Sequence, residues 1–263
     1  MTDCQEFVDA FDGRVQHASQ NFAASRCHRL EVWKNERGYS LKEDGRELDP
    51  QADAESAAEA VLWRMQELSL AALPEFTKIH AGCASWQGKR FLMAGPTRAG
   101  KTTLMTRMLY EGFAVYCDDI VLLRHGQVFP YPRRLWIRAE AVRLLPQIVP
   151  FVVRSRKMRN HFSIDLTELG FEWHIDGAPV DAVFFLEPNH GADTRLEEYP
   201  KYAMAQLIMS QSNLPAAGAH EWVKDVVAML DTASSYLLHC GKLDSAIKAI
   251  KSALERTIDS SSV

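Results

Sequence analysis

The stretch that decides the fold is Gly95-Pro96-Thr97-Arg98-Ala99-Gly100-Lys101-Thr102, which fits the pattern G-x-x-x-x-G-K-[ST]. It lies between an apolar run, residues 90–94, and an amphipathic run, residues 101–110. The first predicts a buried strand and the second a helix packed on that strand. Glycines let the loop between them curl, so that successive N–H groups point at phosphate oxygens near the positive end of the helix dipole. We therefore expect a site for a nucleoside triphosphate, and the strand and helix on either side disfavour a plain structural turn.

Two side chains of the motif have expected roles of their own. Lys101 neutralises the β- and γ-phosphates, and the Thr102 hydroxyl takes one position on Mg²⁺. Arg98 is expected to face outward, because the inward contacts of such a loop come from the backbone. The expected nucleotide-binding residues are Gly95, Thr97, Arg98, Ala99, Gly100, Lys101, Thr102 and Thr103.

Composition narrows the class of protein. The chain has 263 residues, of which 47% are hydrophobic, enough for one substantial domain or a core domain with a small appendage. A net charge of -4 provides no basic field for nucleic acid, so we expect no nucleic-acid partner. No apolar run approaches the roughly 20 residues of a membrane span, and the acidic start Met1–Glu6 lacks the features of a signal peptide. We expect no membrane partner.

The cysteines indicate a reducing compartment. Five are present, an odd number, and they are scattered without a C-x-x-C pair, which argues against a disulfide framework and a zinc knuckle. Reduced thiols and a cytoplasmic location are the simplest interpretation. Cys117 adjoins two carboxylates, which raise the pKa of a thiol, so we expect it to pack rather than to react.

Hydrophobic patterning divides the chain in two. Residues 1–75 predict a small β-rich extension, with a hairpin formed by residues 30–33 and 39–41 and a linking helix over residues 53–73. Residues 76–258 predict the core domain. Its expected strands are 78–84, 90–94, 113–123, 182–186 and 235–239, and its expected helices are 101–110, 200–211, 219–231 and 244–255. Residues 139–153 have a helical pattern that Pro146 and Pro150 cut short, and the tail 260–262 is expected to fray.

Asp118 and Asp119 stand inside an apolar, strand-like run. Burying two carboxylates is costly unless a cation or hydrogen bonds compensate, and Mg²⁺ on a nucleotide is one such compensation. The alternative is a strand-end turn in which Asp118 caps exposed backbone. Because side chains alternate along a strand, both carboxylates face the nucleotide only if the backbone bends, so one of them should matter more.

The order of these motifs resembles a known family. His80-Ala81, the glycine loop, Glu111-Gly112-Phe113 and Cys117-Asp118-Asp119 follow the order of the ATP-binding domain of HPr kinase/phosphorylase and its kinase-like relatives. The resemblance spans most of residues 78–255. It implies an α/β fold, a P-loop core on a mixed β-sheet related to phosphoenolpyruvate carboxykinase. The implied activity is transfer of the γ-phosphoryl group of ATP to a serine hydroxyl.

The same resemblance implies roles for individual residues. Asp118 would accept the serine proton, Asp119 would support it or hold Mg²⁺ together with Thr102, and His80 and Lys101 would face the phosphates. From the residues alone, the more common interpretation of His80 is a core histidine with one satisfied nitrogen, and the resemblance brings the functional role level with it. The chain lacks the glycine-rich signature with which the family binds its protein substrate and supports phosphorolysis. We therefore expect a peptide or protein acceptor other than HPr.

The cation that stabilises transferred charge has several candidates. Residues 154–161 form the densest cationic stretch, either a solvated loop or a segment that closes on the nucleotide. Arg133, Arg134 and Arg138 have a similar claim, although Trp136 and Ile137 between them indicate an ordinary amphipathic strand. Spacing does not choose among them.

The sequence thus predicts a kinase that uses ATP and Mg²⁺ to phosphorylate a hydroxyl, serine in the first instance, on a peptide or protein. Two alternatives stay open: a non-catalytic ATP-binding regulatory module and a small-molecule kinase on the same fold. Retention of both Lys101 and the acidic pair favours an enzyme, because a sensor needs no buried proton acceptor. A homo-oligomer is possible, and the acceptor is not identified.

Overall fold

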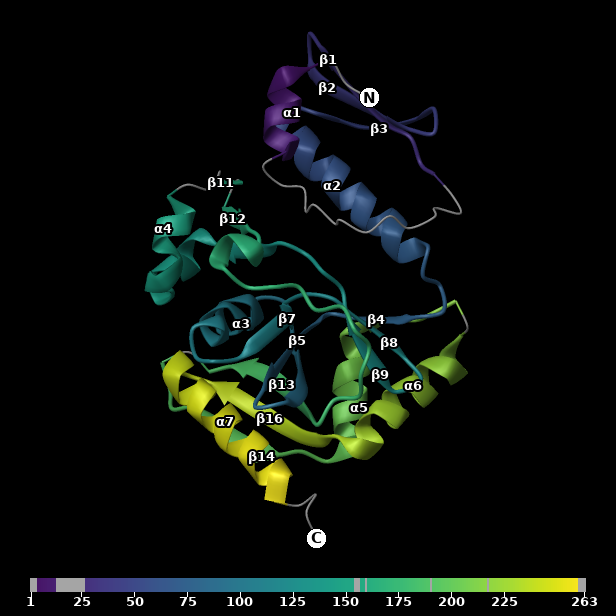
Figure 1. Ribbon diagram of the computed structural model, residues 1–263. Coiled ribbons are helices and arrows are strands. Elements are labelled where there is room, and N and C mark those ends of the chain that lie inside the picture. Colours follow the sequence, from purple (N-terminus) through teal and green to yellow (C-terminus); the bar gives the residue numbers. More distant parts are fainter. Residues whose placement is uncertain are drawn as a thin grey trace. The chain divides into compact units, whose positions relative to one another are not determined.

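The computed structural model in Figure 1 describes residues 4–12, 27–153, 157–158, 160–189, 191–216 and 218–259. The chain divides into two units: Met1–Leu73 with Ser155–Ser163, and Pro74–Arg154 with Ile164–Val263. Each unit is described by itself below. None of the helices in the described parts of the chain combines the length and the apolarity that crossing a bilayer requires.

The first unit is built on an antiparallel sheet in the order β1-β2-β3. Its elements are α1 (Gln5–Asp12), β1 (Leu30–Asn35), β2 (Gly38–Glu43), β3 (Arg46–Gln51) and α2 (Ala54–Ala71). The predicted hairpin and linking helix are confirmed as the β1–β2 pair and α2. α2 begins where the Asp53 carboxylate accepts a hydrogen bond of 2.7 Å from the Ser56 N–H, a typical N-cap.

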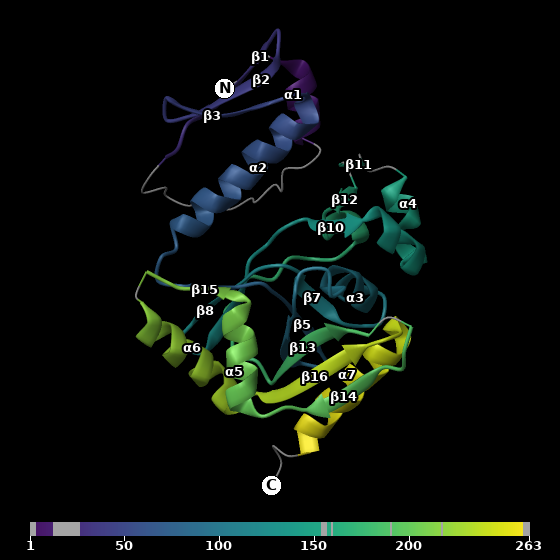
Figure 2. The same cartoon turned by 180° about the vertical axis from the view of Figure 1, so that it is seen from behind.

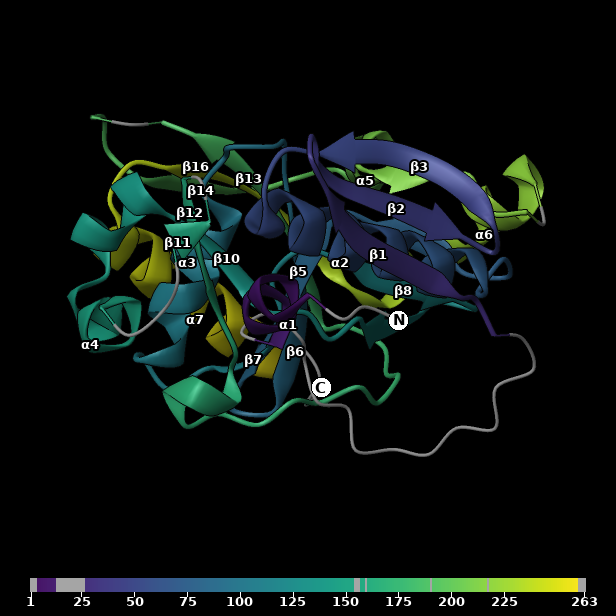
Figure 3. The same ribbon diagram turned by 90° about the horizontal axis from the view of Figure 1, so that it is seen from above.

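Figure 3 shows the three strands of this unit side by side. Alternate apolar side chains of β1 and β2 meet the small residues of α2. The buried side chains include Val32, Tyr39, Leu41, Ala57, Ala58 and Val61. The first unit therefore has a hydrophobic core of its own.

The second unit contains a six-stranded sheet in the order β14-β16-β13-β6-β5-β7. The strands are β5 (Ala81–Trp86), β6 (Lys89–Ala94), β7 (Ala114–Cys117), β13 (Ala182–Pro188), β14 (Arg195–Glu198) and β16 (Ser234–Cys240). β13 is parallel to both β6 and β16, whereas β14, β5 and β7 pair antiparallel with their neighbours. The predicted mixed sheet in an α/β fold is confirmed.

Helices cover both faces of this sheet (Figures 1 and 2). α3 (Lys101–Leu109) and α7 (Leu243–Asp259) contact each other on one face, and α5 (Lys201–Ser210) and α6 (Ala219–Thr232) contact each other on the other. The core beneath α5 and α6 includes Leu92, Val183, Phe185, Met204, Ile208, Val226 and Met229. Strands buried on both faces explain why the sequence shows continuous apolar runs there.

A second, four-stranded sheet in the order β15-β4-β8-β9 lies in the same unit. Its strands are β15 (Ser212–Asn213), β4 (Thr77–Ile79), β8 (Val121–Arg124) and β9 (Gln127–Pro130). Two strand predictions are corrected here. Residues 78–84 form two strands, β4 and β5, and residues 113–123 form β7 and β8, because in each case the chain leaves one sheet and enters the other.

The remaining segment confirms two smaller predictions. The helical pattern of residues 139–153 is divided into η1 (Ala139–Leu144), η2 (Pro146–Ile148) and α4 (Val149–Val152), and its two prolines lie in the first turns of η2 and α4. The strand expected around Trp136 is β10 (Leu135–Arg138). Short elements β11 (Lys157–Met158), β12 (His161–Ile164) and η3 (Thr167–Leu169) follow. The tail 260–262 lies outside the described residues.

Candidate functional site

The sheet brings three distant parts of the sequence to one edge. The register pairs Ala81 with Ala94, and Cys83 with Cys117. The start of β5 and the ends of β6 and β7 therefore lie together. His80 precedes β5, the glycine loop follows β6, and the acidic pair follows β7. The crossing points between the two sheets are thus the positions of His80 and of Asp118–Asp119.

The glycine loop joins β6 to α3, as the sequence predicts. Gly95 has φ 153, and a Cβ there would lie 2.5 Å from the Leu186 carbonyl oxygen, so only glycine fits. Gly100, with φ 99, is the N-cap of α3 and offers no side chain to its first turn. The N–H groups of that turn have no partner within the helix, which leaves them available to an anion. Arg98 is exposed, as expected.

Lys101 is buried and turned back on its own loop. Its Nζ donates hydrogen bonds to the carbonyl oxygens of Gly95, at 2.6 Å, and Pro96, at 3.2 Å. Burial lowers the pKa of Lys101 to about 8, and the Asp118 carboxylate partly opposes the change. The ammonium group thus lies within the loop that phosphates would occupy in a nucleotide-binding protein, held by acceptors that phosphate oxygens can replace.

Asp118 is the inner member of the acidic pair. It is 3% exposed, and its carboxylate accepts a hydrogen bond from the Thr102 hydroxyl. Burial raises the pKa of Asp118, and the positive charges of Arg133 and Lys101 act in the opposite direction. This carboxylate therefore lies against the first turn of α3, beside the side chain predicted to bind Mg²⁺.

Asp119 points elsewhere and is more accessible, with 28% of its side chain exposed. One carboxylate oxygen lies 3.0 Å from His80 Nε2, and the other pairs with the Arg133 guanidinium. The two carboxylates thus have different surroundings, as alternation along a strand requires. Asp118 is enclosed with Thr102, whereas Asp119 faces His80 and Arg133.

His80 is neutral in this site. Burial, and then the charge of Lys101, lower its pKa to about 4, against the opposing effect of Asp118. Arg133 already balances the charge of Asp119, so the contact with Asp119 does not require an imidazolium. A neutral ring that donates its Nε2–H to Asp119 fits this environment. His80 thus orients Asp119.

Arg133 is the cation that sequence spacing did not select. Its guanidinium carbon lies 4.2 Å from the centre of the Trp136 ring, and 14% of its side chain is exposed. Arg134 instead pairs with Asp165 and Glu168, and Arg138 with Glu140. Of these three arginines, Arg133 is the one that contacts the acidic pair. The cationic side chains of residues 154–159 lie outside those that the structure describes.

No family model and no curated protein matches this chain.

The remaining predicted residues belong to the loop or to the core. Thr97 is exposed on the loop, Ala99 is buried, and Thr103 lies in the first turn of α3. Cys117 is buried opposite Cys83, and burial raises the pKa of the Cys117 thiol well above its ordinary value. The prediction that Cys117 packs is in agreement with this environment.

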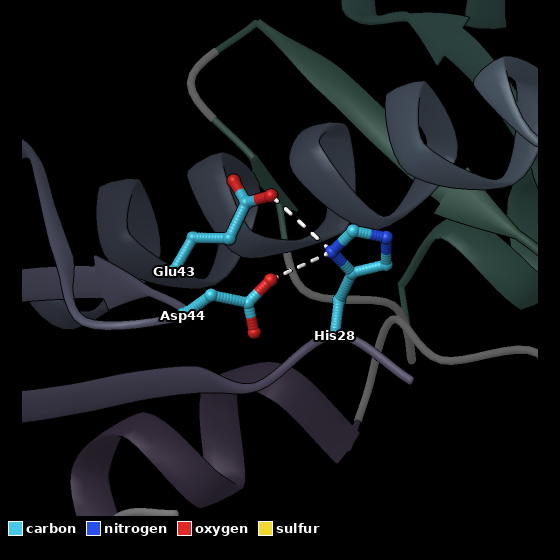
Figure 4. A group of neighbouring side chains, drawn as sticks. All are labelled: His28, Glu43 and Asp44. Atoms are coloured by element: carbon cyan, nitrogen blue, oxygen red, sulfur yellow. Dashed lines mark hydrogen bonds and ion pairs between the residues drawn. The ribbon is translucent and has the colours of Figure 1, made fainter. Parts of the chain in front are cut away.

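Figure 4 shows a group that no sequence pattern indicated, His28, Glu43 and Asp44 in the first unit. His28 Nδ1 lies 2.9 Å from Asp44 Oδ2 and 3.5 Å from Glu43 Oε1. Both carboxylates have other partners: Arg64 donates two hydrogen bonds to Glu43, and the Arg29 N–H donates one of 2.8 Å to Asp44. The group is explained as a network that fixes the start of β1 to the β2–β3 turn, and we assign no metal to it.

Proposed function

We propose that this protein is a kinase that uses ATP and Mg²⁺ to phosphorylate a serine-type hydroxyl of a peptide or protein. The P-loop core and the phosphoryl transfer are those of the HPr kinase-like proteins that the sequence resembles. The observation that carries the proposal is the meeting of the glycine loop, Lys101 and two differently placed carboxylates at one edge of a sheet. Phosphoryl transfer needs this set of a phosphate cradle, a metal ligand and a group that positions the acceptor.

The metal would bind on the Asp118 side of the site. The hydroxyl of Thr102 already donates to the Asp118 carboxylate, so an ion bound by Thr102 would lie next to that carboxylate. An enclosed carboxylate with a raised pKa gains most from a divalent cation, because the cation offsets the cost of its burial. This division differs from the one the resemblance implies, in which Asp119 holds the metal.

Asp119 would accept the proton of the attacking hydroxyl. It is the more accessible carboxylate, and the Nε2–H of His80 fixes its orientation. In the step, the acceptor oxygen forms a bond to the γ-phosphorus, the bond from that phosphorus to the β–γ bridging oxygen breaks, and ADP leaves. The proton passes to Asp119. Lys101 would turn from its own loop to the β- and γ-phosphates, so that catalysis consists mainly of positioning and charge neutralisation.

The two carboxylates can be separated by substitution. In Asp119→Asn we expect Mg·AMP-PNP to bind within about threefold of the parent, and transfer from γ-labelled ATP to fall by a factor of about 10² or more, since the proton acceptor is lost. In Asp118→Asn we expect the affinity for Mg·AMP-PNP itself to fall by about tenfold. Asp231→Asn, on the exposed end of α6, is the matched control and should change neither quantity.

Titration calorimetry measures binding of the nucleotide. The acceptors offered in the transfer assay are serine-containing peptides and the proteins encoded by genes next to the gene for this protein. Transfer by the Asp119→Asn protein at the parental rate would refute the role of Asp119. Binding of the nucleotide without transfer to any acceptor would favour the regulatory module, and transfer to a small molecule alone would favour the small-molecule kinase.

A further inference from the structure

Arg133 interacts with both carboxylates of the site, and the proposed reaction requires its pair with Asp119 to break. Its guanidinium pairs with Asp119, and its charge also acts on Asp118. A proton acceptor that is held by an arginine is a weak base and is shielded from an incoming hydroxyl. If Asp119 is to take the acceptor's proton, Arg133 has to find another partner.

The charges of the site indicate what that partner is. Without nucleotide, Lys101 and Arg133 face Asp118 and Asp119, so that the formal charges cancel. A Mg²⁺-bound triphosphate would add two net negative charges, with the cation held next to Asp118 in the proposed site. Among the described residues, Arg133 is then a cation that contacts the acidic pair and is not yet committed to the phosphates. A planar guanidinium binds phosphate oxygens through two parallel hydrogen bonds, which makes a terminal phosphate a suitable partner.

We propose that Arg133 changes partners when nucleotide binds: the guanidinium leaves Asp119 and binds the γ-phosphate, which frees Asp119 to accept the acceptor's proton. This inference rests on the proposed function. The α- and β-phosphates are less suitable targets, because Asp119 must lie beside the phosphorus that is attacked and Arg133 starts in contact with Asp119. The ring of Trp136 supports the guanidinium in its starting position.

In this exchange, Arg133 balances the charge of the acidic pair while no nucleotide is bound. A carboxylate that accepts a proton next to bound ATP is needed only when both ATP and the acceptor are present. In the empty protein Arg133 holds Asp119, and the third phosphate releases it. ADP, which has no γ-phosphate, leaves Arg133 on Asp119.

Comparison of two nucleotides tests this exchange. In Arg133→Met, which keeps an unbranched apolar chain against Trp136, we expect the affinity for Mg·AMP-PNP to fall by about tenfold or more and the affinity for Mg·ADP to change by less than about twofold. Arg133→Lys should recover part of the loss, because it keeps the charge without the planar fork. Arg138→Met, whose arginine pairs with Glu140, is the matched control and should alter neither affinity.

A role of Arg133 in folding alone would lower both affinities equally, and equal losses, or no loss at all, would overturn the exchange. Binding of Mg·ADP also reports that each variant is folded. Should Arg133→Met fail to fold, the parent protein gives the answer through the ¹⁵Nε resonance of Arg133, which should move with Mg·AMP-PNP and stay in place with Mg·ADP. A resonance that responds equally to both refutes the exchange. If the parent binds neither nucleotide, the proposed function falls, and this inference with it.

Discussion

Lys101 shows how one residue sets the pH range of the site. Its Nζ lies among the carbonyl oxygens of Gly95 and Pro96, and burial lowers its pKa to about 8. A phosphate group favours the charged ammonium, so binding of a nucleotide would raise this pKa again. The charged form is therefore present below pH 8 and is lost as the pH rises through 8 in the empty protein.

We expect the affinity for Mg·AMP-PNP to be constant from pH 6.5 to 7.5 and to fall above pH 8, by at most about tenfold per pH unit, as Lys101 loses its proton. Calorimetry in buffers of different ionisation enthalpy should also show proton uptake on binding near pH 8. Lys101→Met is the control: its affinity should be low, and the decrease above pH 8 should be absent. An identical decrease in this variant would assign the effect to another group.

For individual residues, the sequence identified the candidate site residues but not all of the residues that they contact. The glycine loop, Lys101 and the acidic pair are adjacent in sequence to the elements that position them, so local pattern was sufficient. The sequence could not distinguish Arg133, Arg134 and Arg138, because they differ in the carboxylate with which each one forms an ion pair. Asp119 and Asp165 come from other segments of the chain, and only the fold brings them to Arg133 and Arg134, whereas Glu140 is a near neighbour of Arg138 in the sequence.

For the secondary-structure elements, hydrophobic runs predicted the positions of the strands. They did not predict which of the two sheets each strand joins. Residues 78–84 and 113–123 are continuous apolar patterns, yet each contains a change of sheet. Hydrogen-bond partners of a strand are non-local, and a short strand buried in either sheet has the same composition. Helices α2, α3, α5, α6 and α7 were predicted within a few residues of their bounds, because their periodicity depends on a single exposed face, whereas α1 was not predicted.

One contact between elements makes a test of packing away from the site. The Asp225 side chain on α6 is 4% exposed and accepts a hydrogen bond of 2.7 Å from the His125 N–H in the β8–β9 turn. Asp225→Ala leaves that N–H without its partner, so we expect a loss of about 1–3 kcal/mol in the free energy of unfolding. Asp231→Ala on the same helix should cost less than about 0.5 kcal/mol. Chemical denaturation measures both, and equal losses would contradict this account.

At the scale of the whole molecule, each unit has a separate hydrophobic core. A ligand stabilises the structure that binds it by an amount that grows with the logarithm of the ligand concentration divided by the dissociation constant. The residues proposed to bind nucleotide all belong to the second unit. The proposed nucleotide therefore stabilises the second unit, and the stability of the first unit does not depend on it.

We expect scanning calorimetry to show two transitions, of which Mg·AMP-PNP raises only one, by several degrees at 100 times its dissociation constant. Lys101→Met should keep both transitions and abolish the shift. A single transition that moves as a whole with nucleotide would show that the two units unfold together.

Two connections in the second unit carry one further consequence. A single residue, His80, joins β4 to β5, and only residues 118–120 join β7 to β8. Any tilt of the four-stranded sheet against the six-stranded one is therefore transmitted to the imidazole and the acids through covalent bonds, without a loop to absorb it. Lengthening either connection by one glycine would uncouple that movement from the site, and would strain the backbone hydrogen bonds that the His80 N–H and the Ile120 carbonyl make at these two points.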